Sequence, residues 1–167
     1  MRENEVLVNK LDFESLDREI ALQVACDGAS KGNPGVGGYG WFHSDLFFGW
    51  GGEPNATNNA MELKALASLL KSVPDWVNLD LFLDSRYVIE SLSKYIHVWR
   101  VNGYKTSAGR EIANKVLIME IDELILSRSG AVKFNWVKGH MGHKLNEEAD
   151  RLANKGAEEI LKFGRIS

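Results

Sequence analysis

Apolar residues come first in strand-like runs along this chain and later at helical spacing. An almost unbroken apolar run at 20–27 predicts a central strand, because a strand buried on both faces reads as a continuous apolar segment. Residues 39–42 and 46–50 predict two more strands, joined into a hairpin by the turn His43-Ser44-Asp45. Between the first strand and this hairpin, the glycine-rich stretch 28–40 predicts turns.

From Asn58 onward, apolar residues recur mainly at the three- and four-residue spacing of an amphipathic helix. One apolar run and one alternating segment interrupt this spacing and predict two further strands. In chain order, the later sequence predicts a helix from Asn58 to just before Pro74, a strand at 78–83, a helix at 85–93, an irregular segment at 94–106, a helix at about 108–126, a strand at 132–136 and a last helix at about 146–162.

This order predicts an α/β fold with one five-stranded mixed sheet, in which an antiparallel hairpin segment adjoins parallel strands and helices cover both faces. We assign the domain to residues 20–163 and treat residues 1–19 as an N-terminal extension. The extension is predicted to pack on the domain through an apolar face, and its acidic balance argues against an arm that binds nucleic acid. The residues of that face are Val6, Leu7, Leu11, Phe13 and Leu16.

Composition narrows the class of protein and its compartment. The 167 residues are 44% hydrophobic and 26% charged, as in a soluble globular protein, and no apolar run approaches the roughly 20 residues of a membrane helix. No apolar segment of a signal peptide follows the N-terminus. Cys26 is the only cysteine, which excludes an intramolecular disulfide and indicates a reducing compartment. We therefore expect a cytoplasmic protein. We also expect a monomer, because no surplus apolar face remains once the core is assigned.

The net charge of −3 argues against a nucleic-acid partner until its distribution is considered. Residues 1–19 contain six acids and three bases, so the rest of the chain is formally neutral. Residues 86–115 contain six bases and two acids. This basic segment is either a solvated helical face or a surface that contacts phosphates.

Four acids fall where predicted strands end or helices begin. Asp27 and Asp84 end apolar strands, at the edge where open α/β sheets place their ligands. Glu62 and Asp150 lie in the predicted first turns of two helices, where an acid also has a purely structural explanation. Singly, each acid is best explained as a cap or a surface group. Together they would repel one another unless cations neutralised them, and oxygen ligands favour Mg²⁺.

The sequence around these acids resembles type 1 ribonuclease H. The four strings that carry the resemblance lie at 27–40, 57–63, 84–88 and 136–150, in the order and at the separations that the family shows. The resemblance covers residues 20 to about 160. It implies a ribonuclease H-like fold and an endonuclease that hydrolyses the RNA strand of RNA–DNA hybrids by two-metal-ion catalysis, leaving 5′-phosphate and 3′-hydroxyl ends.

The resemblance also implies roles for individual residues. Two Mg²⁺ ions, with Mn²⁺ as an alternative, would be held by Asp27, Glu62, Asp84 and Asp150. His140 matches the catalytic histidine, for proton transfer or for product and metal release, and His143 is a weaker alternative. The residues implied or expected to contact the substrate are Gly28, Asn33, Asn58, Asn59, Arg86, Trp99, Tyr104, Thr106 and Asn146. Asparagine amides suit the 2′-hydroxyl that distinguishes RNA, although helix capping is an alternative for Asn58, Asn59 and Asn146.

Residues 95–107 resemble the basic protrusion that grips the DNA strand in cellular members of the family. The protrusion is only weakly basic here, since Arg100, Lys105 and Arg110 replace a dense cationic run. We predict weaker and less salt-dependent binding than in more basic relatives. Trp99 is equally well explained as a core residue. A second departure is Lys144-Leu145, which replaces the family's usual Pro-Glu in the predicted loop before the last helix.

Three classes of function remain open at this point. The first is a stand-alone hybrid-specific ribonuclease. The second is a related enzyme of the same fold, such as the nuclease domain of a reverse transcriptase or an integrase-like recombinase. The third is a non-catalytic module that binds hybrids, which would be expected to lack at least one acid. The presence of all four acids, the His140 loop and the 95–107 segment favour the first.

Overall fold

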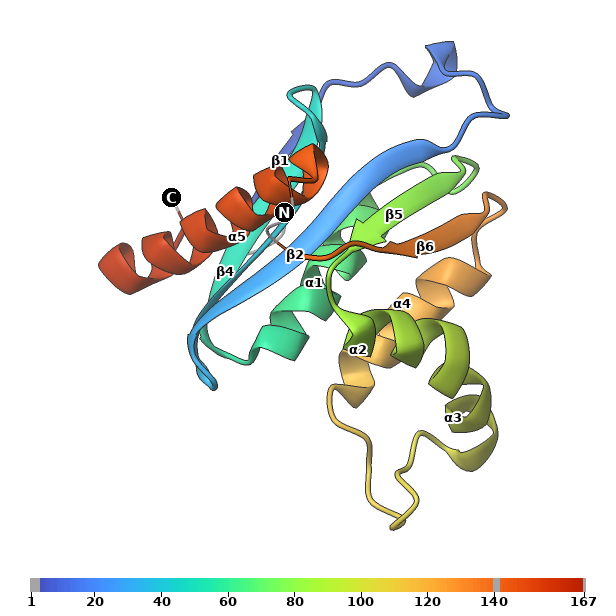
Figure 1. The fold of residues 1–167 in the computed structure, drawn as a ribbon, viewed down its shortest axis with the longest axis vertical. Coiled ribbons are helices and arrows are strands. Elements are labelled where there is room, and N and C mark those ends of the chain that lie inside the picture. Colours follow the sequence, from blue (N-terminus) through green and yellow to red (C-terminus); the bar gives the residue numbers. More distant parts are fainter. Residues whose placement is uncertain (1–3, 140–141, 167) are drawn as a thin grey trace.

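The computed structural model describes residues 4–139 and 142–166, and Figure 1 shows their arrangement. His140 therefore lies outside the described residues. The strands are β1 (Glu5–Asn9), β2 (Leu22–Gly32), β3 (Gly35–Ser44), β4 (Phe47–Ala56), β5 (Leu79–Leu83) and β6 (Val132–Trp136). The helices are α1 (Asn58–Ser72), α2 (Arg86–Glu90), α3 (Ile96–Asn102), α4 (Lys115–Leu126) and α5 (Lys144–Phe163), with a short 3-10 turn at Phe13–Ser15 and a π-helical stretch at Ser91–Tyr95 between α2 and α3.

The strands form one mixed sheet in the order β1-β4-β3-β2-β5-β6. In this order β1, β4, β3 and β2 pair antiparallel with one another, whereas β5 is parallel to both β2 and β6. The mixed sheet is confirmed, but the predicted count of five strands is wrong. The sixth strand is β1, which comes from the N-terminal extension and pairs with the outer edge of β4.

Helices cover both faces of the sheet, as predicted (Figure 1). Helix α1 packs on one face with α4 beyond it, and α5 packs on the other face across β2, β3 and β4. Glycines let α5 lie almost on the strand backbone: a Cβ at Gly38 would come within 1.9 Å of the Ala153 carbonyl oxygen, and one at Gly156 within 1.9 Å of the Gly51 oxygen. This close contact fixes the height of α5 above the sheet.

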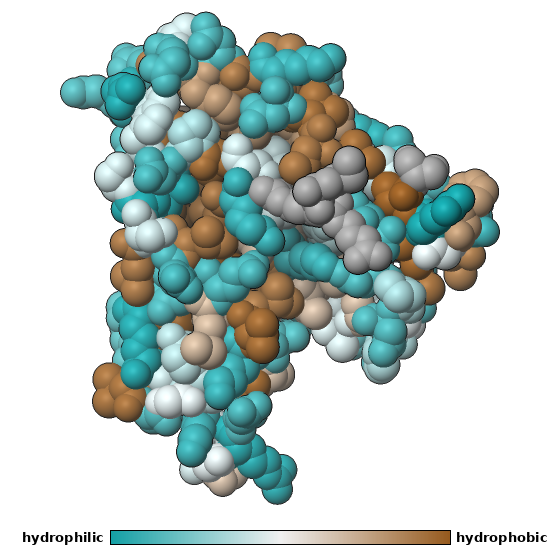
Figure 2. All heavy atoms as spheres, turned by 180° about the vertical axis from the view of Figure 1, so that it is seen from behind, coloured by the Kyte–Doolittle hydropathy of each residue, from teal (hydrophilic) through white to brown (hydrophobic). Residues whose placement is uncertain are grey.

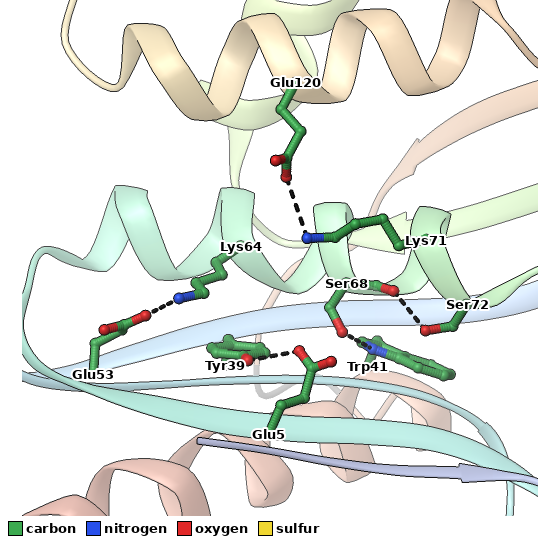
Figure 3. Close-up of polar contacts among 9 residues, drawn as sticks. All are labelled: Glu5, Tyr39, Trp41, Glu53, Lys64, Ser68, Lys71, Ser72 and Glu120. Carbon is green, nitrogen blue, oxygen red and sulfur yellow. Dashed lines mark hydrogen bonds and ion pairs between the residues drawn. The ribbon is translucent and has the colours of Figure 1, made fainter. Parts of the chain in front are cut away.

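The main hydrophobic core lies between the sheet and α1 and extends to α4. Its completely buried residues include Trp41, Leu66 and Leu81. Trp41 donates its indole N–H to Ser68 of α1 at 2.9 Å, so this large side chain is buried without an unpaired donor (Figure 3). A smaller cluster on the α5 face contains Phe42, Trp50 and Leu152.

The extension packs on the domain through most of the residues that the pattern indicated. Leu11, Phe13 and Leu16 contact the main core, and Val6 contacts the smaller cluster. Leu7 is an exception, since it is 41% exposed. Tyr39 of β3 donates its hydroxyl to Glu5 of β1 at 2.6 Å (Figure 3). The division into an extension at 1–19 and a catalytic domain at 20–163 stays a prediction.

Several predicted boundaries are wrong. The stretch 28–40 is mostly strand, because β2 and β3 continue as a long antiparallel pair to a tight turn. Helical structure continues through 94–102 instead of becoming irregular, and it ends before Gly103, which has a φ of 77°. The helix predicted from 108 begins only at Lys115. Lys144 and Leu145 open α5 and are not a preceding loop.

Figure 2 views the molecule from behind and shows apolar and polar residues interspersed on that face. No helix within residues 4–139 and 142–166 combines the length and the apolar character that crossing a bilayer requires.

Candidate metal centre

The register of β2 against β5 brings Asp27 and Asp84 to the same level of the sheet. Ala25 pairs with Phe82, and β5 ends at Leu83, directly before Asp84. Asp27 does not end its strand as predicted. It lies within β2, which continues to Gly32 with β3 as its partner. The two acids therefore meet where the parallel part of the sheet ends, because β5 stops and β2 does not.

Glu62 approaches the same point from α1. This helix is capped by Thr57, whose hydroxyl accepts from the Ala60 N–H at 3.1 Å. Glu62 is thus past the first turn, in contrast to the prediction, and its side chain is buried against the sheet. Gly28 permits this contact, since a Cβ there would come within 2.4 Å of the Glu62 nitrogen.

Three carboxyl groups from three different elements converge at this point. One oxygen from each of Asp27, Glu62 and Asp84 lies within 4.8 Å of the others. Asp27 and Glu62 are only 4% and 8% exposed. The buried Oε2 of Glu62 has no hydrogen-bond partner in the described part of the chain. Such a group of hard oxygen donors fits a divalent cation such as Mg²⁺.

Burial and mutual repulsion both act on these acids. Loss of hydration raises the pKa of Asp27 to about 8, and the charge of Asp84 adds to the rise. The Gly28 N–H, which donates to Asp27 Oδ1 at 2.9 Å, favours the charged carboxylate and limits the rise in the pKa of Asp27. Burial is the largest cause that raises the pKa of Glu62, and the charges of Asp27 and Asp84 raise it further. A cation bound here would reverse this balance and keep the carboxylates ionised.

Asp150 lies beside this group rather than inside it. It belongs to the second turn of α5, because the helix begins earlier than predicted. A hydrogen bond with the Asp150 carboxyl group contributes to the raised pKa of Asp27, so these two side chains are in contact. Asn154, one turn later, donates its amide to the Asp150 carbonyl oxygen at 2.9 Å and to Asp150 Oδ1 at 3.3 Å. The structure thus brings together the four acids that the sequence singled out.

Comparison with known proteins identifies the family. Residues 19–158 match the family model for RNase H. The chain belongs to the ribonuclease H family. The predicted resemblance is confirmed, and the chain is therefore a nuclease.

Relatives and solved structures agree with this assignment. A protein named Ribonuclease H from Acidovorax sp. (strain JS42) is 41% identical over 141 residues, covering 81% of this chain and 93% of the relative. A Ribonuclease H from Neisseria meningitidis serogroup C is 44% identical over 140 residues, covering 80% and 93% respectively. The crystal structure of LC9-RNase H1, a type 1 RNase H with the type 2 active-site motif, superposes with a TM-score of 0.65 at 26% identity, covering 83% of this chain and 74% of that one.

Of the two histidines in the predicted catalytic loop, His143 lies within the described residues and His140 does not. Gly139, directly before His140, lies against Asp84. A Cβ added at Gly139 would be 3.0 Å from Asp84 Oδ2. His143 caps α5 by accepting from the Asn146 N–H at Nδ1, 3.2 Å away, and its ring lies 4.7 Å from that of Phe82. In this family member His143 therefore has a structural role of its own.

The predicted substrate-contacting asparagines take up different positions. Asn58 and Asn59 are exposed at the start of α1, and neither is the cap, since Thr57 serves that purpose. Asn33 accepts from the Asn58 N–H at 3.1 Å and so joins the β2–β3 turn to α1. Asn146 is 4% exposed, and its buried Oδ1 has no partner among the residues described. It does not cap α5 either.

Arg86 lies next to the acid cluster. Its guanidinium stacks over Trp136 at 4.3 Å from the ring centre, and Trp136 donates its indole N–H to the Asp84 carbonyl oxygen at 3.1 Å. The two side chains line a shallow cavity of about 260 Å³ together with Ile89 and Glu90. Arg86 thus carries a cation next to the residues that contact Asp84.

The segment predicted to be the protrusion consists mainly of α3 and the loop that follows, and its free charge is lower than its composition suggests. Arg100 forms a two-pronged ion pair with Asp122 of α4, which is 7% exposed, and the hydrogen bonds to this carboxylate raise the pKa of Arg100. Two apolar residues of α3, Val98 and Val101, are 59% and 88% exposed. Figure 2 shows apolar residues among the polar ones on this lobe, at the lower left.

The three residues predicted to bind substrate in this segment are placed as follows. Trp99 packs against the main core and also against Tyr95, with ring centres 5.8 Å apart. Tyr104 packs on the core and directs its hydroxyl toward Asp122 at 3.4 Å. Thr106 is exposed, and its hydroxyl accepts from the Arg110 N–H at 3.2 Å. Only Thr106 is therefore mainly a surface residue.

Sequence reasoning missed Asp122, Asn154 and Lys31. Asp122 lies in the amphipathic helix α4, where the sequence pattern does not distinguish a buried acid from a surface one. The four-residue spacing from Asp150 to Asn154 puts both on one face of α5 and was a usable signal. Lys31, which donates to Asn154 Oδ1 at 3.1 Å, is 123 residues away in sequence and gave none.

Proposed function

We propose that this protein is an endoribonuclease that hydrolyses the RNA strand of RNA–DNA hybrids, with Asp27, Glu62, Asp84 and Asp150 holding two Mg²⁺ ions. The observation that carries the proposal is the convergence of three carboxyl groups, with one oxygen of each within 4.8 Å of the others, where the parallel part of the sheet ends. Close carboxylates of this kind repel one another strongly in the absence of cations, so a site built for structure alone would avoid them.

The donor set fits this metal. All four side chains offer carboxylate oxygen, the type of ligand that Mg²⁺ prefers and that Mn²⁺ also accepts. Bound ions would supply activation of the attacking water and neutralisation of charge on the leaving oxygen, the chemistry that yields 5′-phosphate and 3′-hydroxyl ends. Glu62 Oε2 is already dehydrated and needs no further desolvation to act as a ligand.

The surroundings of the acids supply groups suited to a hybrid. Asn58 and Asn59 present exposed amides at the start of α1, and an amide can both donate to and accept from a 2′-hydroxyl. Asn33 braces this helix start from the β2–β3 turn. Arg86, stacked on Trp136, offers N–H donors for a phosphate near Asp84. We assign Gly28 to support of the acid cluster rather than to contact with the substrate.

His140 is proposed to transfer protons or to assist release of product and metal, because it follows Gly139 directly and Gly139 lies against Asp84. An imidazole titrates near neutral pH and suits either task. Asn146 is proposed to contact the substrate near the scissile phosphate through its side-chain amide N–H, which can donate to a phosphate oxygen. We propose a cytoplasmic monomer as its working form, which size-exclusion chromatography and cell fractionation would test.

The test is cleavage of a hybrid with a labelled RNA strand. Wild-type protein with Mg²⁺ should cut the RNA strand of the hybrid but not single-stranded RNA, duplex RNA or duplex DNA. Both a chelator and Asp84→Asn should abolish cutting, whereas the exposed Asp45→Asn should leave it unchanged. Activity that survives the chelator or Asp84→Asn would overturn the proposal. End-group analysis of the products would test the 5′-phosphate and 3′-hydroxyl assignment.

A further inference from the structure

Asp150 is the acid that the fold holds least directly. Asp27 and Asp84 are carried by neighbouring strands and Glu62 is packed against Gly28, but Asp150 is half-buried on a helix that crosses the other face of the sheet. Besides its contact with Asp27, its side chain is restrained by the amide of Asn154, which donates to both its carbonyl oxygen and its Oδ1.

The orientation of the Asn154 amide is itself determined by a third residue. Lys31 in β2 donates from Nζ to Asn154 Oδ1 at 3.1 Å. An ammonium group can only donate, so it requires the amide oxygen on its side. The amide nitrogen must then face Asp150, where two oxygens accept from it. If the Asn154 amide were flipped, its oxygen would face the Asp150 oxygens and its N–H groups would face the Lys31 ammonium group. Both contacts would be repulsive.

We propose that Asn154 and Lys31 are positioning residues that hold the Asp150 carboxylate in place for metal binding. The inference rests on the proposed function, since it takes Asp150 as a metal ligand. Lys31 lies four residues after Asp27 on the same strand, so the contact also ties α5 to the strand that carries the central acid. Hydrogen-bonded partners of this kind orient metal ligands, and their loss typically weakens metal binding by about 10- to 100-fold.

Two simpler explanations compete with this one. Asn154 can be a helix residue that bonds to the carbonyl one turn earlier with no effect on the site. Lys31 is exposed, so it can contact a substrate phosphate directly. The first explanation predicts no change in metal affinity without Asn154. The second predicts that Lys31 acts on substrate binding whether or not Asn154 is present.

The first experiment measures Mn²⁺ binding by calorimetry in the absence of nucleic acid, together with thermal unfolding in chelator. Asn154→Ala should weaken Mn²⁺ binding about tenfold or more, while its unfolding temperature in chelator stays close to that of the wild type. Lys155→Ala is the matched control, because this neighbouring side chain lies over Trp50, 4.7 Å from the ring centre, and should leave Mn²⁺ affinity unchanged. Equal Mn²⁺ affinity in Asn154→Ala and wild type overturns the inference and leaves the proposed function intact.

The second experiment is a double-mutant cycle with Lys31→Met. If Lys31 acts through Asn154, Lys31→Met should weaken Mn²⁺ binding in the wild-type background and have almost no further effect in Asn154→Ala. An undiminished effect of Lys31→Met in the Asn154→Ala background overturns the role of Lys31. Wild-type protein that binds Mn²⁺ but does not cleave hybrids would refute the proposed function alone. Failure of the wild type to bind Mn²⁺ at all would refute both.

Discussion

Gly28 in β2 lies directly against the backbone of Glu62 in α1. A Cβ at position 28 would come within 2.4 Å of the Glu62 nitrogen and 2.6 Å of the Met61 carbonyl carbon. Neither backbone atom can move without moving the helix. The distance between the strand that carries Asp27 and the helix that carries Glu62 therefore depends on the absence of a side chain at this one position.

Gly28→Ala should displace the start of α1 and separate the carboxyl groups of Asp27 and Glu62. We expect a loss of about 1–3 kcal/mol in the free energy of unfolding, as for other overpacked sites. Cleavage of hybrids should fall by about 100-fold, because misplacement by about 1 Å has effects of that size. Kinetics at saturating Mg²⁺ and chemical denaturation would measure both.

Gly130→Ala is a suitable control for this variant. A Cβ there would come within 2.2 Å of the Val77 carbonyl oxygen, in a contact that involves none of the four acids. It should lower stability to a similar degree, while folded protein keeps its Mg²⁺ requirement and turnover. Equal loss of activity in the two variants would contradict the role assigned to Gly28.

Asp27→Asn should stabilise the metal-free protein, and more so at high pH. The folded pKa of Asp27 is raised from 3.8 to about 8, so the stability it contributes as a protonated acid is complete below pH 3.8 and is lost as the pH rises through 8. An asparagine carries no such cost. A tenfold change in an acid dissociation constant corresponds to about 1.4 kcal/mol, so we expect a gain of a few kcal/mol at pH 9 and little at pH 4.

Thermal unfolding in chelator at pH 4, 7 and 9 would measure this gain as a difference from the wild type. Added Mg²⁺ should raise the unfolding temperature of the wild type but not of Asp27→Asn, since only the wild type retains the complete site. A difference that is the same at every pH would show that Asp27 is not the group responsible.

Tyr39→Phe should weaken the attachment of the N-terminal strand. The variant loses the 2.6 Å hydrogen bond to Glu5, and bonds to charged groups contribute about 1.5–3 kcal/mol. Denaturant unfolding of Tyr39→Phe, Glu5→Gln and the double variant should show effects that are not additive. Tyr95→Phe, an exposed tyrosine on the protrusion, serves as the control.

Removal of residues 1–9 should lower stability further, because it also exposes the apolar residues that Val6 covers and the outer edge of β4. Hybrid cleavage by the folded fraction should be retained in every one of these variants, since no metal-ligand candidate lies on β1. Unchanged stability without residues 1–9 would refute the structural role of the extension.

The three cations of the protrusion should respond differently to removal. Lys105→Gln and Arg110→Gln should each lower the slope of log binding constant against log salt by about 1 if the residue contacts a phosphate. Arg100→Gln should leave the slope nearly unchanged but cost about 1.5–3 kcal/mol of stability, because it removes the cation that pairs with the buried Asp122. Binding of a catalytically inactive variant to a hybrid at several salt concentrations would measure the slopes.

The same titration tests the affinity predicted for this chain. With Arg100 committed to Asp122, the salt slope should be shallower than that of a relative with a dense cationic run. A slope as steep as that of a strongly basic relative would contradict this prediction, and a reduced slope for Arg100→Gln would contradict the assignment of Arg100 to the ion pair.

The sequence by itself determined the elements that local patterns encode. The apolar run before Asp84 predicted β5 and the apolar–polar alternation at 132–136 predicted β6, while helical spacing after Asn58 predicted α1 almost to the residue. The four acids were recognisable because each interrupts or adjoins such a pattern, and the strings around them carried the family resemblance. These features depend on neighbours within a few residues, so they can be read without the fold.

Tertiary structure alone decided the features that join distant segments. The sixth strand required the free edge of β4, and the position of Asp27 within β2 followed from the pairing of β2 with β3 beyond the end of β5, not from any local signal. Gly28 was identified as a support for Glu62 only when β2 met α1, and Lys31 and Asn154 were associated only when α5 crossed the sheet. The physical reason is that packing and strand pairing depend on contacts between residues far apart in sequence, which no local pattern records.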